Sequence, residues 1–306
     1  MATKLSYKEA TGVIEFTLKD DGVFHYSLQH SPRALAGLVS ALEGIKPEDI
    51  KSIVVENPID LSSLGKETVM DLKLTLNSGK IMNIELQTYM DSFWRPRAIL
   101  YLCRAYDSLK EGEDYSKLKQ TMHYCITDQN LFSENPEFYA RYRLLNIKNH
   151  RSYSDMLGIN VLQLNHAELA TQEDIDNGLL YWTKLFMAKT WEEMQALMLE
   201  HEEIEEVADL ILELNTDNQA KEILEGQRRY REQLATEYAA GVLETQEKYE
   251  AIIEKKDMEF NAIIEDKDVE IADKDAEIAD KNAEIADKDA MIAKLLAENE
   301  ELKKKK

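Results

Sequence analysis

The chain has 306 residues, of which 44% are hydrophobic and 31% are charged, and its formal net charge is -22. This length allows one domain with a substantial core plus additional segments. No run of about 18 apolar residues predicts a membrane-spanning helix, and residues 1–14 lack the apolar core of a signal peptide. The two cysteines, Cys103 and Cys125, are too few for a disulfide framework or a zinc quartet. We therefore expect a cytoplasmic protein that has no membrane partner.

The acidic charge is distributed unevenly along the chain. Residues 200–306 contain 32 acidic and 16 basic side chains, whereas residues 1–199 contain 27 and 21. A net charge of -22 argues against nucleic acid as a partner of the whole chain. The nearly balanced N-terminal part can still present a local basic groove to phosphates.

The first expected elements are a helix and three strands. Residues 32–42 predict a helix that Ser31 caps and that Pro32 begins, with an apolar face of leucine and valine. Residues 50–56 predict a short strand that ends before Pro58. Residues 68–76 and 80–87 alternate between apolar and polar side chains around the turn Asn77-Ser78-Gly79, a pattern typical of a β-hairpin.

The register of this hairpin decides whether two acids become neighbours. A three-residue loop pairs Leu76 with Lys80, and therefore Asp71 with Glu85, with Cβ atoms about 4.5–5.5 Å apart on one face. Two carboxylates at that separation repel each other unless a cation lies between them, and an oxygen-only pair suits Mg²⁺. A two-residue loop would place them on opposite faces. A solvated pair of acids is the alternative interpretation.

Two later segments offer basic side chains for phosphates, and ordinary surface charge is the alternative. One is a helix expected to begin near Pro96, with an inward face of Ile99, Leu102, Cys103 and Tyr106 and with Arg95, Arg97 and Arg104 around it. The other is the segment 141–151, in which bases and tyrosine are interleaved. Between them, residues 122–126 predict a buried strand rather than a metal site.

The C-terminal third is expected to be helical. Thr171 and Thr190 each precede an acid by three residues, which resembles a capping box. From residue 270 a seven-residue unit, EIADKDA, recurs with small changes, and each of its glutamates precedes a lysine by four residues. Such a pair adds about 0.2–0.5 kcal/mol to a helix. No register fills both a and d with large apolar residues, so a self-associating coiled coil and a solvated single helix both remain open.

The hairpin sequence TVMDLKLTLNSGKIMNIELQ resembles the active-site hairpin of the PD-(D/E)XK nuclease family transposases, which include the recombination-promoting nucleases. Further blocks resemble the same family from about residue 12 to residue 215. The resemblance implies an α/β, restriction-endonuclease-like core, a mixed sheet flanked by helices, over residues 1–170. A helical extension over 171–245 and a charged heptad-repeat helix over 246–306 would follow it.

The resemblance also implies an activity and a set of site residues. It implies that Asp71 and Glu85 bind Mg²⁺ or Mn²⁺. It also implies that Gln87, where the superfamily has lysine but this branch commonly has glutamine, orients water or phosphate. The implied activity is metal-dependent DNA endonuclease activity of the transposon-associated type. The alternative is a weak or inactive nuclease fold that acts as a DNA- or protein-interaction module through its helical tail. Lys73, Asp21 and Glu43 are additional candidates for accessory roles.

Overall fold

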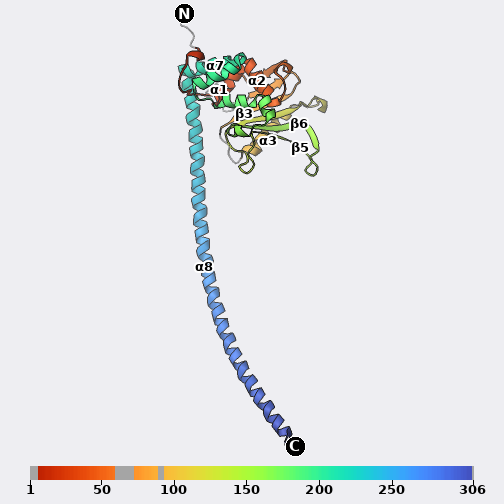
Figure 1. The fold of residues 1–306 in the computed structure, drawn as a ribbon, viewed down its shortest axis with the longest axis vertical. Coiled ribbons are helices and arrows are strands. Elements are labelled where there is room, and N and C mark those ends of the chain that lie inside the picture. Colours follow the sequence, from red (N-terminus) through yellow and green to blue (C-terminus); the bar gives the residue numbers. More distant parts are fainter. Residues whose placement is uncertain (1–5, 59–71, 89–92, 305–306) are drawn as a thin grey trace. The chain divides into compact units, whose positions relative to one another are not determined.

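The computed structural model describes residues 6–58, 72–88 and 93–304. The chain divides into two compact units, Met1–Tyr230 and Arg231–Lys306. The first unit contains one mixed six-stranded sheet with helices on both faces (Figure 1). This is the restriction-endonuclease-like α/β architecture that the family resemblance implies.

The sheet has the strand order β1-β2-β3-β4-β6-β5. Its strands are β1 (Ile53–Val55), β2 (Leu72–Leu76), β3 (Ile81–Gln87), β4 (Thr121–Thr127), β5 (Tyr139–Leu145) and β6 (Ser152–Gln163). β3, β4 and β6 are parallel, while β1, β2 and β5 pair antiparallel with their neighbours. Parallel neighbours require a crossover, and α3 (Trp94–Tyr106) provides it between β3 and β4. Every residue of β4 is buried, as expected for a central strand.

The α-helices of the first unit, apart from α3, precede or follow the central strands. They are α1 (Asp21–His30), α2 (Pro32–Glu43), α4 (Gln172–Asp176), α5 (Leu179–Met187), α6 (Trp191–Glu200), α7 (Glu206–Thr216) and the beginning of α8 (Asn218–Lys304). Short 3-10 turns are η1 (Tyr7–Glu9), η2 (Pro47–Asp49), η3 (Tyr115–Lys117), η4 (Leu164–Leu169) and η5 (Glu202–Ile204).

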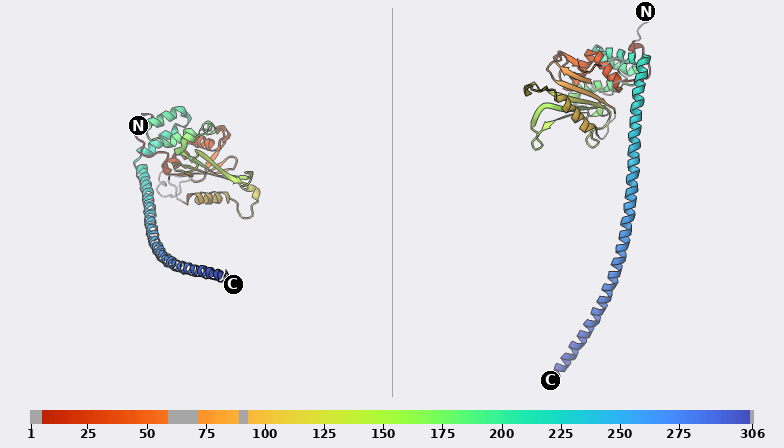
Figure 2. Two further views of the ribbon diagram at one scale, coloured as in Figure 1. Left: turned by 60° about the horizontal axis from the view of Figure 1, so that its bottom comes forward. Right: turned by 180° about the vertical axis from the view of Figure 1, so that it is seen from behind.

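Two hydrophobic cores cover the two faces of the sheet. The larger core joins apolar side chains of β2, β3 and β4, such as Leu74 and Ile84, to α1, α2, α5, α6 and α7. The smaller core lies on the other face, where Trp94 and Ala98 of α3 pack with Cys125 and Val161. Figures 1 and 2 show α3 and the other helices on opposite sides of the strands.

The β2–β3 register is the one that the three-residue loop predicts. Leu72 pairs with Ile84 and Thr75 with Ile81, and the Leu76 N–H donates to the Lys80 carbonyl oxygen at 2.9 Å. Gly79 closes the turn at φ 80°, in the left-handed region that glycine adopts without strain. The two-residue loop is therefore wrong. Asp71, which the prediction places opposite Glu85, lies outside the described residues.

Several local expectations differ from the structure. β1 begins at Ile53 rather than Ile50: Pro47–Asp49 form a 3-10 turn, and residues 50–52 connect it to the strand. α3 buries Trp94, Ala98 and Leu102, four residues apart, so the expected inward positions of Ile99 and Cys103 are wrong: Ile99 is 54% exposed and Cys103 is also exposed.

The capping sequences predict three helix starts, and the structure confirms the side-chain caps at two of them. The capping boxes at Thr171 and Thr190 are confirmed, each with its reciprocal pair of hydrogen bonds. Ser31 occupies the N-cap position of α2, but its side chain makes no capping bond. The first turn of α2 instead begins with proline, which needs no partner for a backbone N–H.

The second unit is the continuation of α8 through the seven-residue repeats. The expected ion pairs form at Glu270–Lys274, Glu277–Lys281 and Glu284–Lys288. Isoleucines of the repeat, such as Ile278 and Ile285, are about half exposed, so coiled-coil self-association stays a prediction. None of the helices in the described ranges has the length and apolarity needed to cross a membrane.

We expect deletion of residues 246–306 to leave the first unit folded. The last residue of its hydrophobic core is Leu224, so the deletion removes no core contact. The thermal unfolding midpoint of residues 1–245 should lie within about 2 °C of the full chain, a shift that corresponds to less than about 1 kcal/mol. A fall of 10 °C or more, measured by circular dichroism, would show that the repeats stabilise the first unit.

Candidate functional site

Three polar side chains alternate along β3 and face α3. Successive side chains of a strand point to opposite faces, so Met82, Ile84 and Leu86 enter the larger core while Asn83, Glu85 and Gln87 point the other way. Glu85 is only 6% exposed. A buried carboxylate requires a cation or well-aligned donors close by. This row of β3 is therefore the candidate functional site.

His123 on β4 lies beside this row. β3 and β4 align Asn83 with His123, and Asn83 Nδ2 lies 3.2 Å from His123 Nδ1. His123 Nε2 is 3.2 Å from Glu85 Oε2, but the pair is poorly aligned, and neither atom makes a hydrogen bond with the described residues. Glu85 therefore presents a buried oxygen that is still available to a further ligand.

Arg97 reaches into the site from α3. Its Nη2 donates to Gln87 Oε1 at 3.1 Å and lies 3.8 Å from Glu85 Oε1. The sequence suggested Arg97 as a contact for DNA phosphates, whereas the structure places its guanidinium between the two site residues of β3. The signal that could have found it is the chain order, because a helix that follows a central strand packs on that strand's face.

The described residues supply only part of the donor set that a divalent cation needs. Among the described residues, no three His, Cys, Asp or Glu side chains gather in a way that could hold a metal ion. Glu85 nevertheless has a buried oxygen without a hydrogen bond, whereas the Gln87 amide oxygen on the same face of β3 accepts one from Arg97. Carboxylate and amide oxygens are the donors that Mg²⁺ and Ca²⁺ prefer. The predicted second carboxylate, that of Asp71, lies outside the described residues.

The accessory candidates lie in different places. Lys73 pairs directly opposite Asn83 and is exposed on the same face of the sheet. Asp21 is the first residue of α1. The neighbouring Lys19 forms an ion pair with Asp128, which directly follows β4.

Glu43 belongs to a separate polar cluster on the opposite face of the sheet. Its carboxylate accepts hydrogen bonds from Lys80 Nζ and from the Tyr124 hydroxyl, and Tyr124 belongs to the larger core. Burial, and then the charge of Glu43, raise the pKa of Tyr124 well above its usual value, so the phenol stays protonated and donates. Glu43 is thus committed to holding α2 against the sheet.

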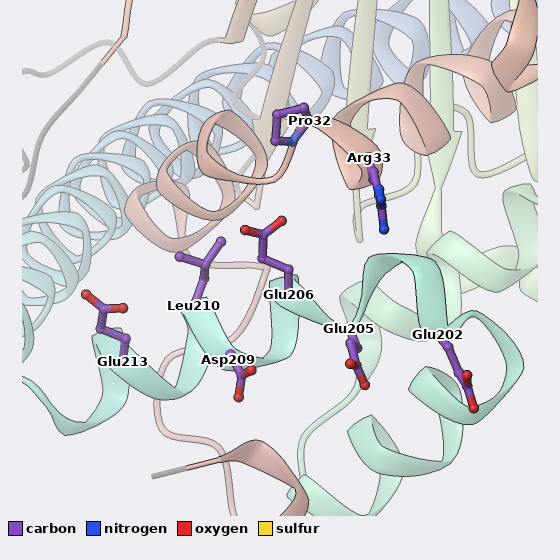
Figure 3. Close-up of a pocket in the computed structure, with 8 residues that line it drawn as sticks. All are labelled: Pro32, Arg33, Glu202, Glu205, Glu206, Asp209, Leu210 and Glu213. Atoms are coloured by element: carbon purple, nitrogen blue, oxygen red, sulfur yellow. The ribbon is translucent and has the colours of Figure 1, made fainter. Parts of the chain in front are cut away.

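One pocket of the first unit is strongly acidic. It has a volume of about 670 Å³ and is lined by Pro32, Arg33, Glu202, Glu205, Glu206, Asp209, Leu210 and Glu213 (Figure 3). Five acids and one arginine would repel phosphates, so this pocket is not a nucleic-acid site. One of its acids, Glu205, has its pKa lowered by hydrogen bonds from Lys8 and Tyr7.

Comparison with protein families identifies a match to this chain. A family model described as PD-(D/E)XK nuclease family transposase matches residues 25–239. This range covers more than half of the chain and includes Glu85, Gln87, Arg97 and His123. No curated protein and no solved structure matches the chain.

We expect Glu85→Gln to stabilise the metal-free protein. The substitution keeps the size of the side chain and removes a buried charge whose Oε2 lacks a hydrogen bond, so the free energy of unfolding should rise by about 1 kcal/mol. The measurement is urea unfolding in EDTA. Glu173→Gln is the control, because Glu173 is an exposed partner of Arg141 and should change little. Destabilisation by Glu85→Gln would show that Arg97 and His123 already compensate the charge.

Proposed function

The chain belongs to the PD-(D/E)XK nuclease family transposases, and from this premise we propose that it is a divalent-metal-dependent DNA endonuclease. The observation that carries the proposal is the buried Glu85, which shares one face of the sheet with Gln87 and lies close to Arg97 and His123. A charged carboxylate at the centre of a sheet is costly as a structural element alone. It is useful where a cation and a phosphate are to be held.

The second proposed metal ligand is Asp71. Leu72 pairs with Ile84, and continuation of this register by one residue would bring Asp71 opposite Glu85. The two carboxylates, with Gln87 two residues further along β3, would form an oxygen-rich site that suits Mg²⁺ or Mn²⁺. A bound ion of this kind polarises a phosphoryl oxygen and lowers the pKa of a coordinated water.

The remaining side chains act on the ligands and on the phosphate. Asn83 and His123 lie in a buried row beside Glu85 Oε2, and with a metal bound they would help to orient the ligating carboxylate. Gln87 would orient the attacking water through its amide. The parallel β3–β4 pair places all of these groups on regular strands, which hold catalytic geometry more precisely than loops do.

Arg97 supplies the positive charge that Gln87 lacks. A lysine at position 87 would place an ammonium beside the reacting water, whereas glutamine offers only a neutral dipole. The Arg97 guanidinium donates to Gln87 Oε1 at 3.1 Å and thus brings a permanent cation to the same place. We therefore assign to Arg97 the stabilisation of negative charge that develops on the phosphate.

We expect the purified protein to nick or cut DNA with Mg²⁺ or Mn²⁺ and to be inactive in EDTA. Asp71→Ala and Glu85→Ala should each abolish cleavage, because each removes a proposed metal ligand. Glu56→Ala is the matched control: Glu56 is an exposed acid that directly follows β1, and its backbone N–H donates to the Lys73 carbonyl oxygen. Cleavage by Asp71→Ala at the wild-type rate would remove Asp71 from the site.

The charge assigned to Arg97 gives a second, independent prediction. Arg97→Met should lower kcat about 100-fold, and the added substitution Gln87→Lys should restore much of the loss by returning a cation to the site. Arg104→Met, on the exposed side of α3, controls for the loss of one positive charge from the same helix. If Gln87→Lys fails to rescue a correctly folded Arg97→Met protein, the role of Arg97 is structural.

The second candidate function is that of an interaction protein built on a nuclease fold. The observation that favours it is Gln87 in place of lysine, together with the acidic repeats after residue 246. Calorimetry separates the two candidates, because this alternative requires that Mg²⁺ and Mn²⁺ fail to bind to the wild-type protein. A binding signal that Glu85→Ala removes would favour the nuclease.

A further inference from the structure

The tip of the β5–β6 hairpin carries positive charge without any acid. Residues 138–154 contain Arg141, Arg143, Lys148 and Arg151 and no aspartate or glutamate, although the chain has a net charge of -22. Two of these bases are engaged: Arg141 pairs with Glu173 at 2.9 Å, and Arg143 Nη1 donates to Asn160 Oδ1 at 2.9 Å. Lys148 and Arg151 form no ion pair with the described residues.

The tip extends beyond the rest of the sheet and has a defined conformation. β6 begins to pair with β4 only at Leu157, so residues 152–156 and the turn before them pass the N-terminal ends of the parallel strands (Figures 1 and 2). The Asn146 N–H donates to the Arg151 carbonyl oxygen at 2.9 Å, and the His150 N–H donates to that of Asn146 at 2.8 Å. The tip is therefore a hydrogen-bonded turn.

One glycine lets this arm stay close to the sheet. A Cβ on Gly158 would lie 2.5 Å from Arg143 Nη1 and 2.7 Å from Met122 Sδ. The Arg143 side chain thus lies directly over Gly158 of β6, and its guanidinium joins β5 to Asn160. The turn that carries Lys148 and Arg151 is anchored at its base by this contact.

The same tip exposes large apolar side chains. Ile147 is 92% exposed and Tyr153 is 87% exposed, next to the two unpaired bases. A shallow pocket of about 590 Å³ lies beside them and is lined by Leu144, Leu145, Asn146, Arg151, Ser152 and Tyr153. Bases that are interleaved with exposed aromatic and aliphatic groups suit the phosphates and the sugar and base edges of DNA.

We propose that the hairpin tip, residues 144–153, is an arm that holds duplex DNA outside the active site. Lys148 and Arg151 contact phosphates, while Ile147 and Tyr153 pack against sugars and base edges. The proposal rests on the proposed function only in taking DNA as the ligand. Positive charge on an otherwise acidic chain attracts a polyanion. The exposed apolar side chains favour DNA among polyanions, because DNA offers sugars and base edges for them to contact.

The register gives the spacing between the arm and the active site. Glu85 aligns with Cys125, and Cys125 aligns with Val161. Arg151 lies ten residues before Val161, which corresponds to about 33 Å at about 3.3 Å per residue. One turn of duplex DNA covers a similar distance, about 34–36 Å. The arm would therefore contact the backbone about one helical turn, or about 10 base pairs, from the phosphate at Glu85.

The test is DNA binding by the full chain in EDTA, where cleavage cannot interfere. Fluorescence anisotropy with a 30-base-pair duplex compares the wild type with Lys148→Ala/Arg151→Ala. Each phosphate contact contributes about 0.9 to the slope of log K against log salt, so the double variant should bind more weakly and show a slope that is lower by up to about 2. Lys46→Ala/Lys51→Ala, at the opposite edge of the sheet near β1, removes the same charge and should leave the slope unchanged.

A second pair of substitutions separates the apolar contacts from the charge. Ile147→Ala/Tyr153→Ala should weaken binding at every salt concentration while keeping the wild-type slope, because no phosphate contact is lost. Hydroxyl-radical footprints should also lose protection about 10 base pairs from the cut that Mn²⁺ activates. The side chains concerned are exposed, and circular dichroism will verify that all variants keep the fold.

The possible results distinguish a failure of this proposal from a failure of the proposed nuclease function. If the double variant keeps the affinity and slope of a wild type that binds and cuts DNA, the arm is overturned and the nuclease remains. If the wild type binds DNA with the predicted dependence on the arm but never cuts, the arm stands and the nuclease fails. Equal binding of polyglutamate with the same dependence on Lys148 and Arg151 would overturn the assignment to DNA.

Discussion

The buried carboxylate of Glu85 is the constraint on which the arrangement around β3 depends. An isolated charge at 6% exposure cannot be tolerated without compensation, and the structure supplies two partial partners, Arg97 at 3.8 Å and His123 at 3.2 Å. Neither makes a well-aligned bond to Oε2. The described residues therefore leave Glu85 Oε2 without a hydrogen bond, and under the proposed function a divalent cation would bind there.

The position of Glu85 is fixed by backbone pairing of β3 with β4, and the preceding residue, Ile84, also pairs with β2. β3 is antiparallel to β2 and parallel to β4, so the ladder on each side holds the strand, and the larger core anchors the alternate side chains such as Ile84 and Leu86. The same period of two that buries those side chains presents Glu85 and Gln87 to α3. Core packing and site geometry are thus two consequences of one alternating sequence.

Local sequence patterns predict the strands that carry Glu85 and several of the helix boundaries. Alternation and the turn Asn77-Ser78-Gly79 predict the hairpin and its register, and the acids three residues after Thr171 and Thr190 predict two helix starts. The contributions of His123 and Arg97 could not be read in the same way. They depend on β4 and α3 lying against β3, a non-local contact that no short sequence pattern contains.

The buried face of α3 is a second feature that the local sequence does not determine. Ile99 and Cys103 are apolar, but the face that packs on the sheet is set by the largest anchor, Trp94, and by Ala98 one turn later, which contact Cys125 and Val161. This choice of face is what aims Arg97 at Gln87. The positive charge beside Gln87 is therefore carried by Arg97 of α3 rather than by a residue of β3. Its place in the site depends on how α3 packs, whereas a lysine at position 87 would be held by the strand itself.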